Sequence, residues 1–261
     1  MLFRSGQAIQ KIAPAIAFGC TVVLKPSEET SLSTLRLGEL IVEAGFPAGA
    51  VNIVTGYGAE VGAALVDHPL VRKIAFTGST ATGQRIMEAA ARSMKRVTLE
   101  LGGKSPAIVL PDADLERAIP GVAGAIFANS GQICTAGSRL LVHASIFDEV
   151  MEGVCRIASG IRLGSQFDAQ TQMGPLISAR QRDRVAGLVA RGLEEGASAL
   201  SGGCAPERDG WFYSPTVLGG VERDMTVMRE EIFGPVVCAV DRKSTRLNSS
   251  HVSESRMPSS A

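Results

Sequence analysis

The sequence has no excess of charge of either sign and no long apolar run. Lys plus Arg equals Asp plus Glu at 26 each, so no overall field would hold nucleic acid or an anionic membrane surface. Gly, Pro or a charged residue interrupts every candidate membrane-spanning run, and residues 1–20 lack the cleavage pattern of a signal peptide. We therefore expect a cytoplasmic enzyme with a small-molecule substrate, and no nucleic-acid or membrane partner.

Paired cysteines and clustered metal ligands are lacking as well. The five cysteines are odd in number, widely spaced and never arranged as CxxC, and the three histidines are equally scattered. We expect neither a disulfide framework nor a metal site. A cysteine is most often a small buried hydrophobe, and four of the five keep that interpretation: Cys20, Cys155, Cys204 and Cys238.

What is present is an alternation of short apolar runs and helical patterns from about residue 7 to residue 240. This alternation is typical of an α/β fold with a mostly parallel sheet. The pattern shifts near Gly102 and Gly103, so we place a domain boundary there, between residues 1–101 and 102–240. The predicted strands are residues 21–24, 51–54, 73–76, 97–99, 107–110 and 139–142.

One predicted helix contains a conflict. Asp114 can cap a helix whose apolar stripe runs from Leu115 to Phe127. Pro120 falls in the middle of this stripe, where proline removes a hydrogen bond at a cost of roughly 3 kcal/mol. We therefore expect a kink or a broken first turn.

The two ends of the chain differ from its middle. Residues 241–261 are rich in Ser and Arg and have no apolar periodicity, so burial cannot offset their ordering entropy and we expect disorder. Residues 1–5 also lead into no periodic pattern. We expect a fragment, truncated at both ends, whose terminal residues are foreign to its core.

The segment NSGQICTAGSR places Cys134 in a loop between an amphipathic helix and an apolar strand. Catalytic side chains are common on loops that rigid elements hold in place. A nucleophilic thiol needs a nearby base or a stabilised thiolate. The flanking Gly131 and Gly137 would let backbone N–H groups approach a developing oxyanion.

The segment VTLELGGKSP places Glu100 directly after an apolar strand, where burial of a carboxylate is energetically unfavourable. One interpretation is structural, with Glu100 capping a helix or pairing with Lys104. The other is functional, because a partly desolvated carboxylate is suited to take a proton from water.

Two loops follow predicted strands and could bind a nucleotide. Gly78 and Ser79 form a glycine turn before a helix, where free N–H groups suit an anion, although GxGxxG is absent and a helix cap is the simpler interpretation. Lys25 and Glu28 follow another strand, at the edge where α/β sheets bind nucleotides, unless they merely form a solvated loop.

The last motif, REEIFGPVV, sets Glu231 and Phe233 in a Gly-Pro loop, where a lone acidic residue is usually just exposed.

Taken in order, KPSE, FTGST, LELGGKSP, GQICTAGSR and EEIFGPV resemble the motifs of the aldehyde dehydrogenase superfamily. The similarity covers the chain from about residue 7 to residue 240, which is only the middle of a full-length member. It implies a parallel-sheet NAD-binding domain over residues 1–101 and an α/β catalytic domain over residues 102–240.

The resemblance also implies roles for the matching residues in oxidising an aldehyde to a carboxylate. Cys134 matches the nucleophile that forms a thiohemiacetal and then a thioester, and Glu100 matches the base that activates water for hydrolysis. An acid at position 28 would repel a 2′-phosphate, which favours NAD over NADP. The implied cofactor contacts are Lys25 and Glu28 on the adenosine ribose, Ser79 of the Gly78 turn on the pyrophosphate, and Glu231 and Phe233 on the nicotinamide ribose and ring.

Departures from the family pattern leave alternatives open. Leu2 stands where the family has an oxyanion-binding Asn, and losing such a donor typically costs on the order of 100-fold to 1000-fold in rate. The chain taken literally could therefore be inert or only bind the cofactor. CoA-acylating members generally lack the base, so Glu100 argues against that reaction. The full-length family is usually dimeric or tetrameric, which implies a homo-oligomer.

Overall fold

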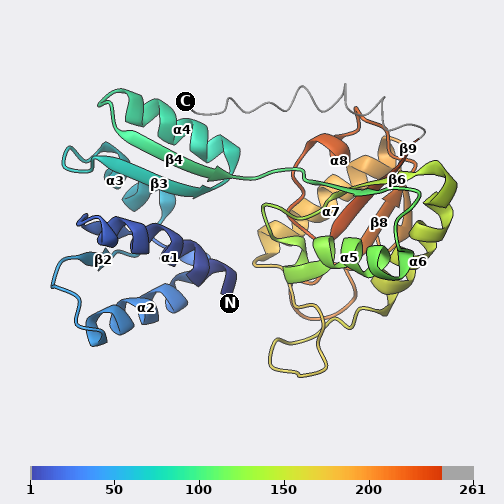
Figure 1. Cartoon of the computed structure of the whole chain (residues 1–261), viewed down its shortest axis with the longest axis horizontal. Coiled ribbons are helices and arrows are strands. Elements are labelled where there is room, and N and C mark those ends of the chain that lie inside the picture. The colour runs from blue at the N-terminus through green and yellow to red at the C-terminus, as the bar shows by residue number, and fades with distance from the viewer. Residues whose placement is uncertain (1, 243–261) are drawn as a thin grey trace. The chain divides into compact units, whose positions relative to one another are not determined.

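The computed structural model describes residues 2–242, with side chains described from Gly6. The chain divides into two compact units, Met1–Gly102 and Gly103–Ala261 (Figure 1). The predicted disorder of residues 243–261 lies outside the described residues. No helix among the described residues is long and apolar enough to cross a membrane.

The first unit contains two pairs of parallel strands with helices between them. Every strand predicted for this part of the chain is present, and β1 pairs with β2 while β3 pairs with β4. The first helix begins at Leu2, so residues 2–5 are helical although their sequence shows no periodic pattern. The elements are α1 (Leu2–Ala17), β1 (Val22–Leu24), η1 (Glu28–Thr30), α2 (Ser31–Glu43), β2 (Val51–Ile53), η2 (Gly58–Gly62), α3 (Ala63–Asp67), β3 (Lys73–Gly78), α4 (Thr80–Ala91) and β4 (Arg96–Leu101).

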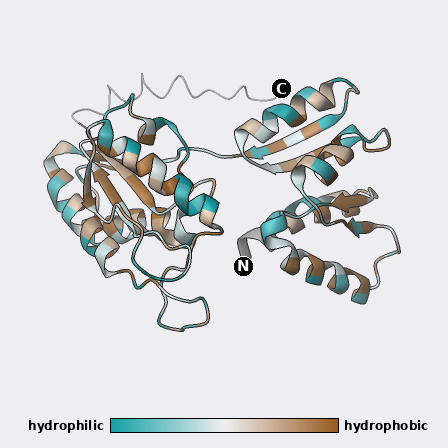
Figure 2. Ribbon diagram, turned by 180° about the vertical axis from the view of Figure 1, so that it is seen from behind, coloured by the Kyte–Doolittle hydropathy of each residue, from teal (hydrophilic) through white to brown (hydrophobic). Residues whose placement is uncertain are grey.

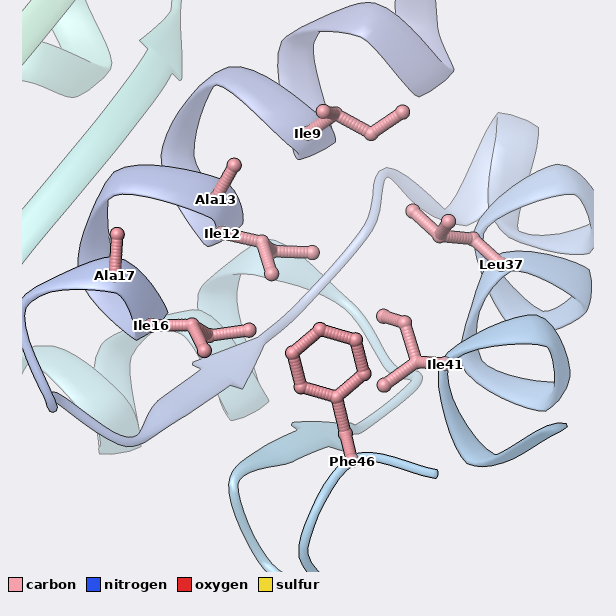
Figure 3. Close-up of a pocket in the computed structure, with 8 residues that line it drawn as sticks. All are labelled: Ile9, Ile12, Ala13, Ile16, Ala17, Leu37, Ile41 and Phe46. Carbon is pink, nitrogen blue, oxygen red and sulfur yellow. The ribbon is translucent and has the colours of Figure 1, made fainter. Parts of the chain in front are cut away.

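Apolar side chains on α1 and α2 face each other across a pocket (Figure 3). Ile12 and Ile16 project from α1, Ile41 projects from α2, and Phe46 lies between the two helices. Helix α2 also packs against β2, so closely that a Cβ on Gly38 would lie 2.7 Å from Ile53 Cδ1. A side chain at position 38 would therefore force Ile53 to move.

The second unit contains a five-stranded sheet with the order β5-β6-β9-β8-β7, parallel except for β7. Figure 2 shows its strands as mainly hydrophobic, as expected for a sheet covered by helices on both faces. The sequence predicted β5 and β6 but not β7 to β9. The elements are β5 (Pro106–Val109), α5 (Leu115–Phe127), η3 (Ala128–Gly131), β6 (Arg139–His143), η4 (Ala144–Ile146), α6 (Phe147–Gly160), α7 (Ala179–Glu194), β7 (Ser198–Ser201), β8 (Thr216–Gly219), α8 (Thr226–Arg229) and β9 (Val236–Arg242).

Two hydrophobic cores hold this sheet. The first packs α5 and α6 against it around Leu140 and Val217, which are fully buried. The second packs α7 and α8 around Val185 and Leu218, also fully buried. Strand β9 takes part in both cores and pairs with β6 as far as Arg242. The ordered sheet thus extends two residues beyond the predicted end at residue 240.

Helix α5 confirms one prediction and corrects another. The Asp114 side chain caps the helix by accepting a hydrogen bond from the Glu116 N–H at 3.1 Å. Of the two expected alternatives, a kink or a broken first turn, the broken turn is wrong, because the helix runs through Pro120 to Phe127. Proline leaves the Glu116 carbonyl without its helical partner, and both residues are exposed, so water can satisfy that carbonyl at little cost.

Candidate active site

The candidate residues of the first unit lie at the carboxyl ends of its parallel strands. Lys25 follows β1, Gly78 ends β3, and Glu100 is the next-to-last residue of β4. Carboxyl edges of α/β sheets are the usual location of nucleotide sites. The strand order therefore gives each of these residues a position from which it could contact a ligand.

Lys25 connects the ends of two strands and holds Glu28. Its Nζ donates to the carbonyl oxygens of Pro26 at 2.6 Å and Gly56 at 3.2 Å, and lies 3.7 Å from Glu28 Oε2. The Lys25 side chain is only 15% exposed, whereas that of Glu28 is 41% exposed. The arrangement leaves the Glu28 carboxylate free to accept hydrogen bonds from hydroxyl groups.

Ser79 is the N-cap of α4, as the simpler interpretation of its sequence predicted. Its Oγ accepts the Thr82 N–H at 3.3 Å and lies 2.9 Å from Thr82 Oγ1. A Cβ on Gly78 would lie 2.5 Å from the Phe76 ring, so a larger residue in this turn would have to displace that ring. The start of α4 still presents the positive end of the helix dipole and unpaired N–H groups of its first turn, a position suited to a phosphate.

The expectation that the Glu100 carboxylate is partly shielded from water is wrong. It belongs to β4 itself and is exposed, because alternate residues of this strand point to opposite faces and Leu99 and Leu101 take the inner one. Its parallel partner in β3 is Thr77, whose Oγ1 accepts a hydrogen bond from Lys11 Nζ at 2.6 Å. Burial lowers the pKa of Lys11, and the nearby Glu100 carboxylate opposes that shift. Lys11 was missed by the sequence analysis, although a single lysine in the apolar run QKIAPAIA was a visible signal.

In the second unit Cys134 lies at the amino edge of the sheet, between η3 and β6, and is half-buried. The residues before it adopt an uncommon backbone, since Asn129, Ser130 and Gly131 all have positive φ, at 51°, 56° and 69°. This backbone conformation costs a non-glycine residue of order 1–3 kcal/mol, and it persists only where the surrounding structure enforces it. The loop of Cys134 is therefore held in one conformation by its neighbours.

Side-chain hydrogen bonds supply part of that constraint. Ser130 Oγ donates to the Gly174 carbonyl at 2.9 Å, and Gln132 Oε1 accepts the Ile177 N–H at 3.1 Å. Ser130 and Gln132 are themselves buried. Both bonds tie the loop to the segment that leads into α7, so the position of Cys134 depends on residues more than forty positions later in the sequence.

The glycines around Cys134 have steric roles. A Cβ on Gly131 would lie 2.0 Å from the Gly234 carbonyl oxygen, so this loop packs directly on the Glu231–Pro235 loop. The Gly137 N–H donates to the Ala125 carbonyl at 3.0 Å. The Gly137 N–H itself is therefore already used within the protein.

Glu231 and Phe233 lie beside this loop. The Gly103 N–H donates to Glu231 Oε1 at 3.3 Å, and a Cβ on Gly103 would be 3.2 Å from the Cys134 carbonyl oxygen. Burial raises the pKa of Glu231, opposed by the Gly103 hydrogen bond and by the charges of Arg184 and Lys104. Phe233 has a φ of 55°, a genuine outlier for a bulky residue.

Helix α7 holds the backbone of the Glu231–Phe233 segment. Gln181 Nε2 donates to the carbonyl oxygens of Ile232 at 3.1 Å and Phe233 at 2.8 Å, and an Arg184 guanidinium N–H donates to the Glu231 carbonyl at 2.9 Å. Sequence reasoning missed both α7 residues. The only available signal was Ser178 followed three residues later by Gln181, the pattern of a capping box.

In the second unit Glu231 and Phe233 line a small pocket together with Gly103 and Gly131. Cys134 is not among the lining residues, but its carbonyl oxygen lies next to Gly103. Four non-glycine residues with positive φ are found in the described part of the chain; Phe233 lines this pocket, and Asn129 and Ser130 directly precede Gly131, which also lines it. Strained backbone of this kind clusters at functional sites. The remaining predicted residues, Lys25, Glu28, Gly78, Ser79 and Glu100, belong to the first unit.

Comparison with known proteins gives a consistent result. The chain is 52% identical to a putative aldehyde dehydrogenase, DhaS, of Bacillus subtilis. The match extends over 233 residues, which are 89% of this chain and 47% of that protein. It is 51% identical to a phenylacetaldehyde dehydrogenase of Pseudomonas fluorescens, with the same coverage. A solved NAD⁺ complex of an aldehyde dehydrogenase from Bacillus cereus matches with a TM-score of 0.90 and 48% identity, over 91% of this chain and 48% of that one.

The chain spans about half the length of the relatives it matches. A family model described as the aldehyde dehydrogenase family matches residues 5–247, which include every candidate residue named above. The chain therefore belongs to the aldehyde dehydrogenase family.

Proposed function

We propose that this sequence provides the nucleophile, the base and the cofactor contacts for NAD-dependent oxidation of an aldehyde to a carboxylate. The observation that carries the proposal is the enforced, strained loop that presents Cys134 next to the Glu231–Phe233 segment. The names of the relatives and the NAD⁺ bound by a structural neighbour support it. For the full-length protein we further propose a cytoplasmic homo-oligomer.

The residues present fit NAD. The Glu28 carboxylate is partly exposed at a strand end and can accept ribose hydroxyl groups, while its charge disfavours the 2′-phosphate of NADP. The Gly78-Ser79 turn at the start of α4 suits a pyrophosphate. Glu231 and Phe233 would take the nicotinamide ribose and ring. When bound, NAD supplies the hydride acceptor that allows a thiohemiacetal to become a thioester.

Each catalytic residue then has one task. The Cys134 thiolate forms a C–S bond with the aldehyde carbon, and the carbonyl oxygen takes the negative charge of a thiohemiacetal. After oxidation, Glu100 accepts a proton from a water molecule whose oxygen attacks the thioester carbon. The C–S bond breaks, a carboxylic acid leaves, and Cys134 returns to the thiolate. The exposure of Glu100 gives water ready access to its carboxylate.

The test is aldehyde-dependent NADH formation by the purified chain, with the acid product identified by mass spectrometry. We expect Cys134→Ser to abolish turnover, and Glu100→Gln to allow acylation while blocking release of the acid. Cys155→Ser is the matched control, because Cys155 is also half-buried but lies on α6. Acyl-CoA formation that requires CoA, with no free acid, would contradict the hydrolytic reaction. NAD binding without turnover would instead support the cofactor-binding alternative.

A further inference from the structure

The segment that leads into α7 makes hydrogen bonds to both loops of the candidate active site. In the Cys134 loop, Gln132 Oε1 accepts the Ile177 N–H at 3.1 Å. In the Glu231–Phe233 segment, the carbonyl oxygen of its last residue accepts a hydrogen bond from Gln181 Nε2 at 2.8 Å. Because Ile177 and Gln181 belong to one short stretch of chain, that stretch joins the two loops.

The joining stretch is itself fixed. Leu176 is buried in the second hydrophobic core, and its N–H donates to the Trp211 carbonyl at 2.9 Å. Ser178 caps α7, because its Oγ accepts the Gln181 N–H at 3.3 Å. Since packed interiors transmit strain rather than absorb it, a stretch held in this way can pass a displacement from one loop to the other.

Both loops have backbone conformations that need support from outside. Asn129 and Ser130 have φ values of 51° and 56°, and Phe233 has a φ of 55°. Such conformations persist only where the surrounding structure enforces them. The Gln132 carbonyl accepts a hydrogen bond from Asn129 Nδ2 at 3.0 Å, and Gln181 binds the carbonyl of Phe233 itself. Each glutamine therefore supports the strained backbone of one loop.

We propose that Gln132 and Gln181 are positioning residues that act together, and that residues 177–181 set the separation between the Cys134 thiol and the Glu231–Phe233 segment. The coupling is inferred from the contacts. It rests on the proposed function only for the identity of the two groups that it places, the nucleophile and the nicotinamide ring. A displacement of about 1 Å between reacting groups can cost about 100-fold in rate.

A second route between the loops has to be distinguished from this one. Gly131 of the first loop packs directly on the Gly234 backbone of the other, so a displacement could also pass through that contact. If Gln132 and Gln181 act in series, loss of either one breaks the link, and loss of the second has little further effect. If the loops communicate by direct packing, the effects of the two losses add.

The test is a double-mutant cycle on the rate of Cys134 alkylation by iodoacetamide in the native whole chain, followed by mass spectrometry. Gln181→Met should raise that rate by more than about twofold, the lower limit of coupling within one hydrogen-bond network, because the half-buried thiol of a loosened loop becomes more accessible. In a Gln132→Met background the same change should have no effect. An unchanged rate in Gln181→Met alone, or the same factor in both backgrounds, would overturn the proposal.

Gln172→Met is the matched control, because Gln172 Oε1 also accepts a backbone N–H, that of Arg162 at 2.8 Å, in a bond that involves neither loop. It should leave Cys134 alkylation unchanged. Label on Cys238, which is buried in the same unit, identifies a variant that unfolds instead of changing locally.

Gln132→Glu covers the case in which Gln132→Met does not fold. Its carboxyl oxygen can still accept the Ile177 N–H, so the link is kept. Gln181→Met should therefore accelerate Cys134 alkylation in this background as much as in the wild type. Loss of that effect would contradict the proposed coupling.

NAD binding, measured by calorimetry, separates this inference from the proposed function. If both hold, Gln132→Met weakens NAD binding and Gln132→Glu restores it, although Gln132 belongs to the Cys134 loop. If the alkylation cycle shows the coupling but the wild-type chain binds no NAD, the coupling stands and the assigned ligand is wrong. If NAD binds the wild type and Gln132→Met equally, the assigned ligand stands and the coupling is wrong.

Discussion

Gly131 lies where a single added methyl group would collide with backbone atoms. Its φ is +69°, and a Cβ would lie 2.0 Å from the Gly234 oxygen, 2.3 Å from the Gly234 carbon and 2.8 Å from the Pro235 nitrogen. A left-handed backbone costs an alanine roughly 1–2 kcal/mol, and forcing an extra methyl group into a packed site typically costs about 1–3 kcal/mol. Gly131→Ala should therefore lower the free energy of unfolding by about 2–5 kcal/mol, a large part of the usual stability of a domain.

Urea unfolding measures this effect directly. The only tryptophan, Trp211, lies in the second unit, so its fluorescence follows the unit that contains Gly131. The matched control is Gly124→Ala in α5, where a Cβ would meet nothing within 4 Å. That change should stabilise the helix by up to about 1 kcal/mol. If Gly131→Ala unfolds at the same urea concentration as the wild type, the two loops do not pack as described.

Three further predictions concern α7 and the second core. Gln181→Ala removes two hydrogen bonds to the Ile232 and Phe233 carbonyls, so it should cost roughly 1–3 kcal/mol in urea unfolding and weaken NAD binding, whereas the exposed Gln170→Ala should do neither. Burial, helped by Cys204, raises the pKa of Tyr213 to about 12. The contribution of Tyr213 to the free energy of unfolding is complete below the pKa of an unfolded tyrosine, about 10, and is lost as pH rises through the folded pKa. Tyr213→Phe should abolish this loss of stability at high pH. The buried Cys238 thiol should resist iodoacetamide until the second unit unfolds, and mass-spectrometric detection of label at Cys238 in the native chain would contradict its burial.

Local sequence pattern was sufficient to predict those strands that are uninterrupted apolar runs. All six predicted strands exist, with ends displaced by at most two residues. Strand β7 gives no such signal, because Ser198 and Ser201 flank only two apolar residues and three of its four residues are exposed. Strand β9 has the apolar run VVCAV, yet the pattern predicted no strand there. Its central place in the sheet depends on pairing with β6 and β8, which lie far from it in sequence.

The site shows the same division between local and long-range information. Asp114 and Ser79 cap their helices through bonds to residues two or three positions away, and such contacts can be predicted from sequence. Gln181 holds the carbonyl of a residue 52 positions later, and Lys11 reaches Thr77 across 66 positions. No local pattern encodes these pairs.

The candidate residues lie at the carboxyl edge of the strands in the first unit and at the amino edge of the sheet in the second. The rule that α/β sheets bind nucleotides at their carboxyl edge therefore accounts for only some of them. In the first unit the residues follow the carboxyl ends of β1 and β3 or lie at the end of β4, where the rule predicts a ligand. Cys134 and the Glu231–Phe233 segment precede β6 and β9, at the amino edge. That edge has no general tendency to bind ligands, so a site there must be built from loops whose conformation their neighbours enforce. The positive φ values of Asn129, Ser130 and Phe233 show where neighbouring residues enforce an unfavourable backbone, and they support the proposal of a site at this edge independently of any motif.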